Sequence, residues 1–300
     1  MSIELIISLI KANIVLAVLL TNTILLIWFE RKVVAGMQSR VGPDRAGPFG
    51  ILQTLADAIK LLLKEQILPS KADRAMYLLA PLIALVPSFL IFMIIPLGPD
   101  ITVQWQNALY TIPLVGADLN VGVLYFLALS SIAVYSVVLA GWSSGSKYPL
   151  LGGVRASAQM ISYEAAMGLA LVPVILYSGS LSLVDIVNSQ SGNLSSSIPI
   201  LNTIVSFIPK WNIFPQFVAF GIFFIAAVAE VNRAPFDLVE AEQELVGGFH
   251  TEYSGFRFAM FFLAEYINMF NMCAITATFF LGGWLGPTFE GILPPIFSVI

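Results

Sequence analysis

Six long apolar stretches run through this sequence and leave few folds open to it. They lie at about 10–29, 76–97, 121–142, 157–178, 211–231 and 255–282. A helix needs about 20 apolar residues to cross the hydrocarbon core of a bilayer, so each stretch predicts one membrane-spanning helix. A seventh run, at about 289–300, is too short to cross by itself and contains Pro294 and Pro295.

The scarcity of charge indicates the same fold class. Charged residues make up 11% of the chain and hydrophobic residues 58%, whereas soluble proteins carry about 25% charged and 45–50% apolar residues. So few charges cannot cover a surface that faces water. We therefore expect an all-α integral membrane protein, with residues 1–300 forming a single transmembrane domain of about six to seven spanning helices. A soluble enzyme, a nucleic-acid-binding module and a disordered scaffold are excluded.

The chain has little capacity to hold a cofactor of its own. Its net charge is −4, it has no basic tract for a phosphate backbone, and it contains one cysteine, Cys273, and one histidine, His250. These two residues cannot by themselves form a zinc, iron–sulfur or haem site, nor a disulfide. We expect any redox centre that this protein serves to belong to a partner. The first apolar stretch lacks a small-residue cleavage site and is expected to remain as a span.

Lysine and arginine residues predict the orientation in the membrane. Twelve of the 14, counting Arg257 at the edge of the sixth stretch, fall in or next to the segments after the first, third and fifth apolar stretches, and only Lys11 and Lys210 fall on the other side. Basic residues concentrate in cytoplasmic loops. The N-terminus is therefore expected outside, and the loops at 30–75, 143–156 and 232–254 are expected on the cytoplasmic side.

The first of these loops contains a second kind of helix. Between Pro48 and Pro69, apolar residues recur at helical spacing and polar residues occupy the opposite stripe. Such an amphipathic helix lies in the membrane interface. It could act as a surface anchor or as a wall of a cavity that opens to lipid. The apolar stripe is Ile51, Leu55, Ile59 and Leu62, and the polar stripe is Gln53, Asp57, Lys60 and Lys64.

Three carboxylates lie in or at the end of apolar stretches: Glu164, Glu230 and Glu265. An ionised side chain at bilayer depth costs about 2.5–3.5 kcal/mol, so each is a candidate functional residue. The alternative is a structural salt bridge or a position just outside the hydrocarbon, most of all for Glu230, which is close to Arg233. A buried carboxyl without a cation can carry a proton near neutral pH, which suits a proton relay.

The loop after Glu230 is the most acidic part of the chain. If a helix begins near Asp237, this residue is a natural N-cap and Glu240 completes a capping box. Asp237, Glu240 and Glu244 then share one face, and Glu242 points elsewhere. Either these acids are simply solvated, or they handle protons or dock a partner, which we favour because the rest of the chain is so poor in charge.

All three loops that are expected on the cytoplasmic side contain motifs similar to those of a known family. The first loop contains Glu30-Arg31-Lys32, Gln38–Pro43 and Gly47–Gly50; the second contains Ser146–Tyr148 and Gly152–Gln159, followed by Ile161–Glu164; the third contains Glu230–Glu244, Gly248 and Thr251–Gly255, followed by Ala264–Tyr266. In this order, from about residue 28 to residue 284, the chain resembles one family of respiratory complex I membrane subunits. Its members are called the H subunit in bacteria and subunit 1 of the NADH dehydrogenase in mitochondria.

The resemblance implies roles for particular residues. In this family the subunit joins the membrane arm to the peripheral arm and forms much of the quinone-access chamber, which Arg31, Arg40 and Asp57 would line. A carboxylate chain thought to lead toward the antiporter-like subunits would complete the proton relay. It maps onto Glu164, Glu230, Glu240, Glu242, Glu244, Glu252 and Glu265.

The resemblance also implies partners and a location. Quinone is the substrate, and FMN and iron–sulfur clusters lie in partner subunits, so this chain alone holds no complete active site of the proton-pumping NADH–quinone oxidoreductase. The expected partners are the peripheral-arm quinone-site and iron–sulfur subunits, the antiporter-like membrane subunits and membrane lipid. The location is a bacterial cell membrane or an organellar inner membrane.

Two departures from the family pattern stand out. Val239 replaces the usual proline near the start of the acidic helix. The family has eight spanning helices, and this sequence ends inside the first of the last two, so the C-terminal helices are expected to be missing. Two other functions remain open: a quinone-independent membrane subunit of an energy-converting hydrogenase, and a stand-alone proton-coupled transporter. The latter often shows two matching halves, which we do not find here.

Overall fold

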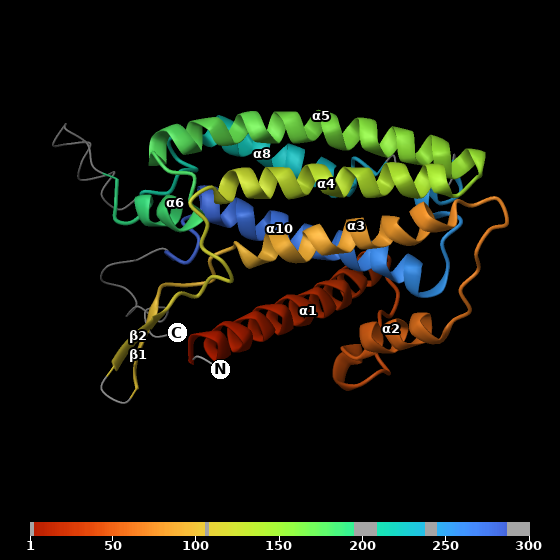
Figure 1. The fold of residues 1–300 in the computed structure, drawn as a ribbon, viewed down its shortest axis with the longest axis horizontal. Helices are drawn as coiled ribbons and strands as arrows, with labels where there is room; N and C mark the ends of the chain where they lie inside the picture. The colour runs from red at the N-terminus through yellow and green to blue at the C-terminus, as the bar shows by residue number, and fades with distance from the viewer. Residues whose placement is uncertain (1–2, 106–107, 195–208, 238–244, 287–300) are drawn as a thin grey trace. The chain divides into compact units, whose positions relative to one another are not determined.

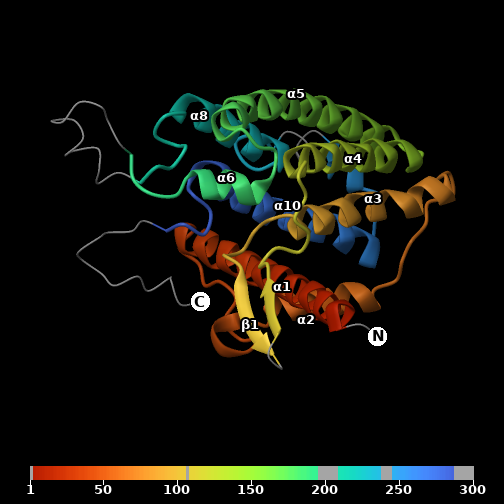
Figure 2. The same ribbon diagram turned by 60° about the vertical axis from the view of Figure 1, so that its left-hand side comes forward.

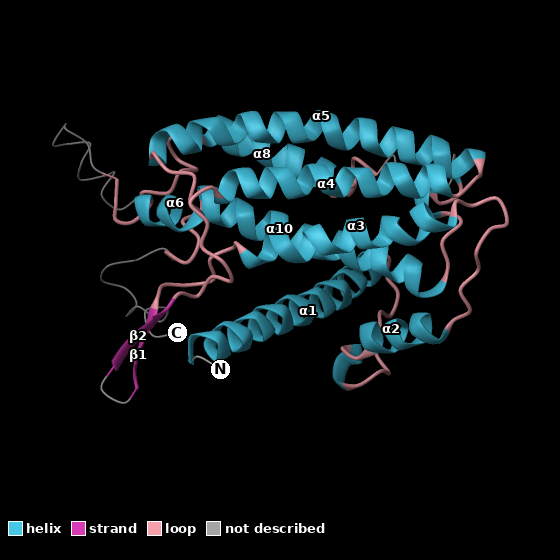
Figure 3. Ribbon diagram, viewed as in Figure 1, coloured by secondary structure: helices cyan, strands magenta, loops and turns pink. Residues whose placement is uncertain are grey.

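The computed structural model describes residues 3–105, 108–194, 209–237 and 245–286, and within them long helices follow the apolar stretches (Figures 1 and 3). Among the described residues, five helices are long and apolar enough to cross a membrane, which confirms the all-α membrane fold class. The helix in the fifth stretch, α8, has 14 residues and is shorter. The six helices are α1 (Ile3–Met37), α3 (Arg74–Met93), α4 (Gly122–Ser143), α5 (Lys147–Ser178), α8 (Phe217–Glu230) and α10 (Gly255–Phe280). The run at 289–300 lies outside the described residues.

Helix α1 is longer than its apolar stretch. It continues through Glu30, Arg31 and Lys32 and ends at Met37, because no proline interrupts this segment and lysine and arginine are good helix formers. The chain leaves the helix at Ser39, which has a left-handed φ of 53°. Glu30 and Arg31 therefore project from a helix and have fixed directions.

The amphipathic helix is present as α2 (Gln53–Leu63), preceded by a short 3-10 helix at Pro48–Gly50. No residue of α2 is buried, and Leu55, Ile59 and Leu62 each expose about half of their surface. The apolar stripe is thus not covered by the described residues of this chain. This arrangement suits a helix whose apolar face meets lipid, as the sequence predicts.

Helix α5 begins at Lys147, so only three residues separate it from α4. The segment expected as a loop at 143–156 is therefore mostly helical. Pro149 is tolerated in the first turn, and glycines allow close packing of the backbones. A Cβ atom on Gly141 would lie 2.5 Å from the Pro149 carbonyl oxygen, and one on Gly152 would lie 2.7 Å from the carbonyl carbon of Gly248.

Prolines lie inside two spans, and another group binds one of the freed carbonyls. Pro81 and Pro87 lie inside α3, and Pro173 lies inside α5. Pro81 has no N–H for the carbonyl of Tyr77, and the Tyr253 hydroxyl donates to that oxygen at 3.2 Å. The bond ties the third loop to α3 at a point where the helix needs a partner.

One small sheet departs from an all-helical fold. Strands β1 (Ile101–Trp105) and β2 (Ala108–Ile112) pair antiparallel, with Ile101 opposite Ile112 and Trp105 opposite Ala108 (Figure 2). The hairpin occupies the connection between α3 and α4. Two short helices complete the described elements: α6 (Leu183–Ser189) and a 3-10 turn at Gly248–His250.

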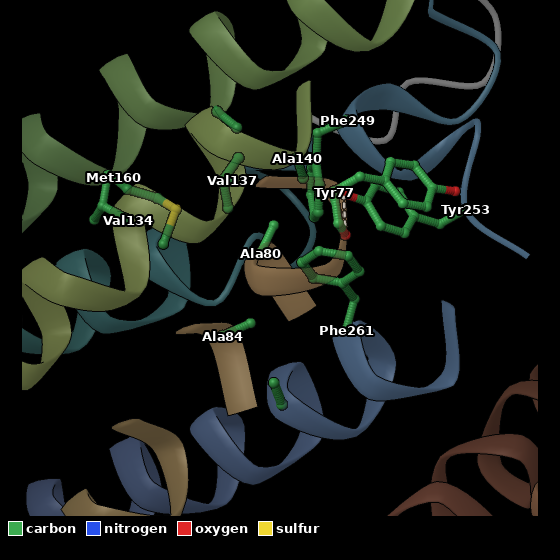
Figure 4. Packing of buried hydrophobic residues seen from close by; sticks show 12 residues of the cluster. Tyr77, Ala80, Ala84, Val134, Val137, Ala140, Met160, Phe249, Tyr253 and Phe261 are labelled. Carbon is green, nitrogen blue, oxygen red and sulfur yellow. Dashed lines mark hydrogen bonds between the residues drawn. The ribbon is translucent and has the colours of Figure 1, made fainter. Parts of the chain in front are cut away.

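The chain divides into two compact units, each with its own core. The first unit comprises Met1–Phe92, Ala128–Glu164 and Ala227–Asn271, and the second comprises Met93–Leu127, Ala165–Ala226 and Met272–Ile300. In the first unit, Tyr77 stacks on Tyr253 with ring centroids 4.1 Å apart, and Phe261 packs edge-on against Tyr253 (Figure 4). In the second, Phe223 and Phe280 pack at 5.5 Å. The candidate site residues that the structure describes all belong to the first unit.

The approach of α5 to the third loop gives a first prediction. Gly152→Ala should destabilise the protein by about 1–3 kcal/mol, because the new methyl group overlaps the Gly248 backbone and neither segment can shift easily. Gly36→Ala is the matched control, since nothing lies within 4 Å of its added Cβ atom and alanine favours the helix. Denaturant unfolding in detergent measures both. Equal stability of the two variants would contradict the described contact.

Candidate functional site

Glu230 lies at the C-terminal end of α8 and is 7% exposed. The Ser130 hydroxyl donates a hydrogen bond to its Oε1 atom, and Oε2 has no hydrogen-bond partner among the described residues. The C-terminal end of a helix carries partial negative charge, so α8 does not compensate a carboxylate there. Glu230 is therefore a buried carboxyl group with one oxygen held and the other available.

Glu164 in α5 is held in a similar way. The Ser131 hydroxyl donates to its Oε1 atom. Ser130 and Ser131 are consecutive in α4, and neighbouring helical residues point about 100° apart, so one turn of α4 serves both carboxyl groups. Sequence reasoning selected the acids and missed the serines. The signal available was a pair of adjacent hydroxyls within an apolar stretch.

Arg233 joins two further acids. Its Nη1 atom lies 3.0 Å from Glu30 Oε1, its Nη2 atom lies 3.2 Å from Glu265 Oε1, and the Tyr266 ring lies 4.7 Å from the guanidinium carbon. Burial acts to lower the pKa of Arg233, but Glu265, Tyr266 and Glu30 outweigh it and the pKa is raised. Glu265 is thus not a carboxylate without a cation, because its cation lies 32 residues away in sequence. From the sequence, Glu30 was named only as a motif residue, and Arg233 only as a possible salt-bridge partner of Glu230.

The turn between Glu230 and Arg233 is fixed by a side chain of α5. Gln159 Nε2 donates to the carbonyl oxygens of Ala229 (3.0 Å) and Phe236 (2.9 Å) and contacts Asn232 Oδ1 at 3.3 Å. Asn232 has a left-handed φ of 52°, which asparagine tolerates better than most residues. These contacts set the distance between the buried carboxyl and the arginine.

A small cavity of about 60 Å³ lies beside these groups. A cavity needs room for about one water-sized sphere and two or more polar partners to hold a water molecule, and this one meets both conditions. The polar lining residues are Ser136, Glu230, Asn232, His250, Glu265 and Asn268.

His250 lines the same cavity and is 8% exposed. The rings of Phe249, Phe258 and Phe262 surround it, with centroids 4.9, 5.3 and 5.7 Å from the imidazole. Burial lowers the pKa of His250 to about 4. The imidazole is therefore neutral at physiological pH and adds no positive charge beside the acids.

Arg31 and Asp57 form a second group, between α1 and α2. Arg31 Nη1 lies 2.5 Å from Asp57 Oδ2, and Gln53 Nε2 donates to Asp57 Oδ1 at 3.0 Å. Burial acts to raise the pKa of Asp57, but the bonds from Arg31 and Gln53 and the charges of Arg31 and Lys60 hold it below its usual range. Helices α1 and α2 lie side by side here (Figures 1 and 2).

The remaining predicted residues belong to neither of these two groups. Arg40 lies on the exposed turn after α1, where its Nε atom donates to Gln38 Oε1 at 2.6 Å, so it is not part of the Arg31–Asp57 pair. Asp237 is exposed, and the main-chain oxygen of Glu252 accepts a bond from the Tyr77 hydroxyl. Glu240, Glu242 and Glu244, with the helix expected to begin at Asp237, lie outside the described residues.

The shared guanidinium yields a second prediction. Arg233→Gln should cost about 1–3 kcal/mol of stability, between the values for exposed and buried ion pairs, because Glu30 and Glu265 lose their cation. Arg233→Lys should fall between, since one ammonium cannot present two separate nitrogens. Arg45→Gln removes the same charge from an exposed position of the first loop and should have little effect. Denaturant unfolding tests the series, and equal losses in the Arg233→Gln and Arg45→Gln variants would refute a specific bridge.

The single histidine yields a third prediction. Because the unfolded chain protonates His250 near pH 6.5 and the folded chain only near pH 4, stability is complete above pH 6.5 and is lost as the pH falls toward 4. Between pH 6.5 and 5 the loss should be about 2 kcal/mol. His250→Phe should remove this part of the pH dependence. Unfolding followed from pH 8 to 5 measures it, and identical pH profiles would argue against a neutral buried imidazole.

Comparisons with known proteins identify the family. The sequence profile described as NADH dehydrogenase matches residues 10–300. The chain is 51% identical over 286 residues to the second H subunit of the NADH-quinone oxidoreductase of Syntrophobacter fumaroxidans, covering 95% of this chain and 79% of that protein. It is 49% identical over 300 residues to the protein of the same name from Koribacter versatilis (97% and 80%), and 54% identical over 271 residues to that of Geobacter metallireducens (87% and 72%). The chain therefore belongs to the NADH dehydrogenase family, among the H subunits of NADH-quinone oxidoreductase.

Proposed function

We propose that this chain is a membrane subunit of a proton-pumping NADH–quinone oxidoreductase and that it couples quinone reduction to proton translocation. The names of its relatives state the enzyme, and the five candidate spanning helices suit a membrane subunit. The structural observation that carries the coupling role is Glu230, which is buried with one free oxygen beside a polar cavity that Glu265 also lines.

The quinone side of the proposal rests on α1 and α2. Quinone enters from the bilayer beside the uncovered apolar face of α2, and its head group passes the Arg31–Asp57 pair toward a site that partner subunits complete. A tight ion pair at the mouth of an apolar passage offers polar contacts to a carbonyl head group without a net charge. Arg40, on the turn that follows α1, is the third residue that we assign to this chamber.

The two groups of charged residues are connected through α1. Arg31 pairs with Asp57, and its neighbour Glu30 pairs with Arg233, which also holds Glu265. From Glu265 the cavity leads to Glu230, and adjacent serines of α4 connect Glu230 with Glu164. A change of charge at the quinone can thus reach Glu164 through contacts that are each close enough to respond.

The chemistry requires such a response. Reduction of a quinone to a quinol takes up two electrons and two protons, and the electrons come from a partner's iron–sulfur cluster. The two electrons bring negative charge close to Arg31 until the two protons neutralise it. This change alters the balance among Asp57, Glu30 and Glu265, which lie on the path to Glu230, and a carboxyl group with a free oxygen can change its protonation in turn. We assign the relay to Glu164, Glu230 and Glu265, with Asp237, Glu240, Glu242, Glu244 and Glu252 of the third loop as further members.

This assignment implies partners for the chain. Peripheral-arm subunits supply FMN and iron–sulfur clusters and complete the quinone site, and antiporter-like membrane subunits receive the protonation change. A subunit of an energy-converting hydrogenase would need no quinone passage. A stand-alone transporter would need no partner at the cytoplasmic loops. Identity of about half the residues to H subunits of NADH-quinone oxidoreductase favours the oxidoreductase over both.

The relay gives a fourth prediction. Glu230→Gln and Glu164→Gln should each suppress quinone-linked proton pumping in reconstituted vesicles severalfold, because glutamine keeps the shape but carries no exchangeable acidic proton. Glu65→Gln is the matched control, since Glu65 is exposed between α2 and α3 and has no part in the relay. Pumping and the amount of assembled complex are measured together. Unchanged pumping in both relay variants of the assembled complex would rule out the relay.

A further inference from the structure

A second hollow, of about 510 Å³, lies where α3, α4 and α5 come to the same side of the first unit. It is formed by the residues just before α3, the end of α4 and the first turn of α5. Lys71 and Lys147 line it together with Trp142, Met76 and Leu150. Neither the quinone passage nor the carboxylate relay uses these residues.

The backbone around this hollow is firmly held. The Asp73 N–H donates to the Ser143 carbonyl at 3.0 Å, which joins the start of α3 to the end of α4. Gly145 has a left-handed φ of 65°, and a Cβ atom there would lie 2.6 Å from the Lys71 carbonyl oxygen. Glycine is therefore required for the two lysine-bearing segments to approach each other.

The charge in the hollow is positive. Within the described ranges neither Lys71 nor Lys147 forms an ion pair. The one acid, Asp73, accepts bonds from the main-chain N–H groups of Ala75 (3.1 Å) and Met76 (3.4 Å), so its charge is engaged at the start of α3. The 32-residue helix α5 begins at Lys147 and adds the partial positive charge of its N-terminus.

The rim of the hollow is apolar and uncovered. Trp142 is 69% exposed, Leu150 44% and Met76 40%. These residues stand at the ends of three spanning helices, which is the depth at which lipid phosphates lie and at which tryptophan concentrates in membrane proteins. The hollow thus combines cations, an interfacial indole and apolar side chains at one level.

We infer that this hollow binds the phosphate head group of an anionic phospholipid. The ammonium groups of Lys71 and Lys147 contact the phosphate, and Trp142, Leu150 and Met76 contact the glycerol and the first methylene groups. Basic pockets between helices at the membrane surface favour such head groups. A zwitterionic lipid would bring its own cation against the lysines and bind less well. The inference does not depend on quinone or proton transfer.

Quenching of tryptophan fluorescence by lipid tests the site. The complex that contains this chain is placed in nanodiscs of phosphatidylcholine with a small fraction of phosphatidylglycerol whose acyl chains are brominated near the head group. The difference between the native protein and its Trp142→Phe variant isolates the contribution of Trp142. This difference should saturate at low phosphatidylglycerol content. In the Lys71→Gln/Lys147→Gln variant the required content should rise about tenfold or more, because two cations are removed.

The control removes the same charge elsewhere. Lys11→Gln/Lys210→Gln changes the two lysines expected on the opposite side of the membrane and should leave the quenching curve unchanged. Equal quenching in both double variants would overturn the inference. Release of the lipid by millimolar inorganic phosphate would indicate a site for a soluble anion and would also overturn it. Loss of a partner subunit from the Lys71→Gln/Lys147→Gln variant, with quenching retained, would identify a protein-docking surface instead.

Discussion

The cost of placing charge in a medium of low dielectric constant governs the arrangement of the first unit. Arg233 is the main group that offsets this cost. Its planar guanidinium presents separate nitrogens to Glu30 and Glu265 and lies over the ring of Tyr266. One arginine thereby serves as the cation for two carboxylates.

Glu230 shows the other solution to the same problem. It has a hydroxyl in place of a cation, and a hydroxyl can donate to a carboxylate or accept from a carboxylic acid. An arginine would fix the ionised form, whereas a serine leaves both forms tolerable. The three acids at membrane depth are thus satisfied in two ways, Glu265 by an arginine and Glu230 and Glu164 by serine hydroxyls.

Much of the fold follows from the sequence, because spanning helices are encoded by local composition. The long apolar stretches, the amphipathic helix and the carboxylates at depth are all visible in the residues themselves. The helix ends were predicted less accurately. Helix α5 begins ten residues before its apolar stretch, because its first turns pack through Gly152 against Gly248, and hydrophobicity does not reveal such packing. The hairpin at 101–112 could have been found, because Ile101-Thr102-Val103 is rich in β-branched residues.

The contacts of the site were harder to foresee. Arg233 and Glu30 are 203 residues apart, and no local pattern connects them. Serine in a spanning helix commonly bonds to the backbone of its own helix, as Ser88 and Ser136 do here, so the contacts of Ser130 and Ser131 with the two carboxyl groups emerge only from the neighbouring helices. Local patterns identify which groups are costly to bury, and tertiary packing decides how each one is satisfied.

The bond from Tyr253 to the carbonyl that Pro81 leaves without a donor also restricts motion. The Tyr253 hydroxyl comes from the third loop and satisfies the Tyr77 carbonyl in α3. Separating the loop from α3 would leave this carbonyl without a donor in a medium of low dielectric constant, so the two segments are held together. The end of the third loop is therefore anchored to α3 at Tyr253, and its beginning is anchored to α1 and α10 at Arg233.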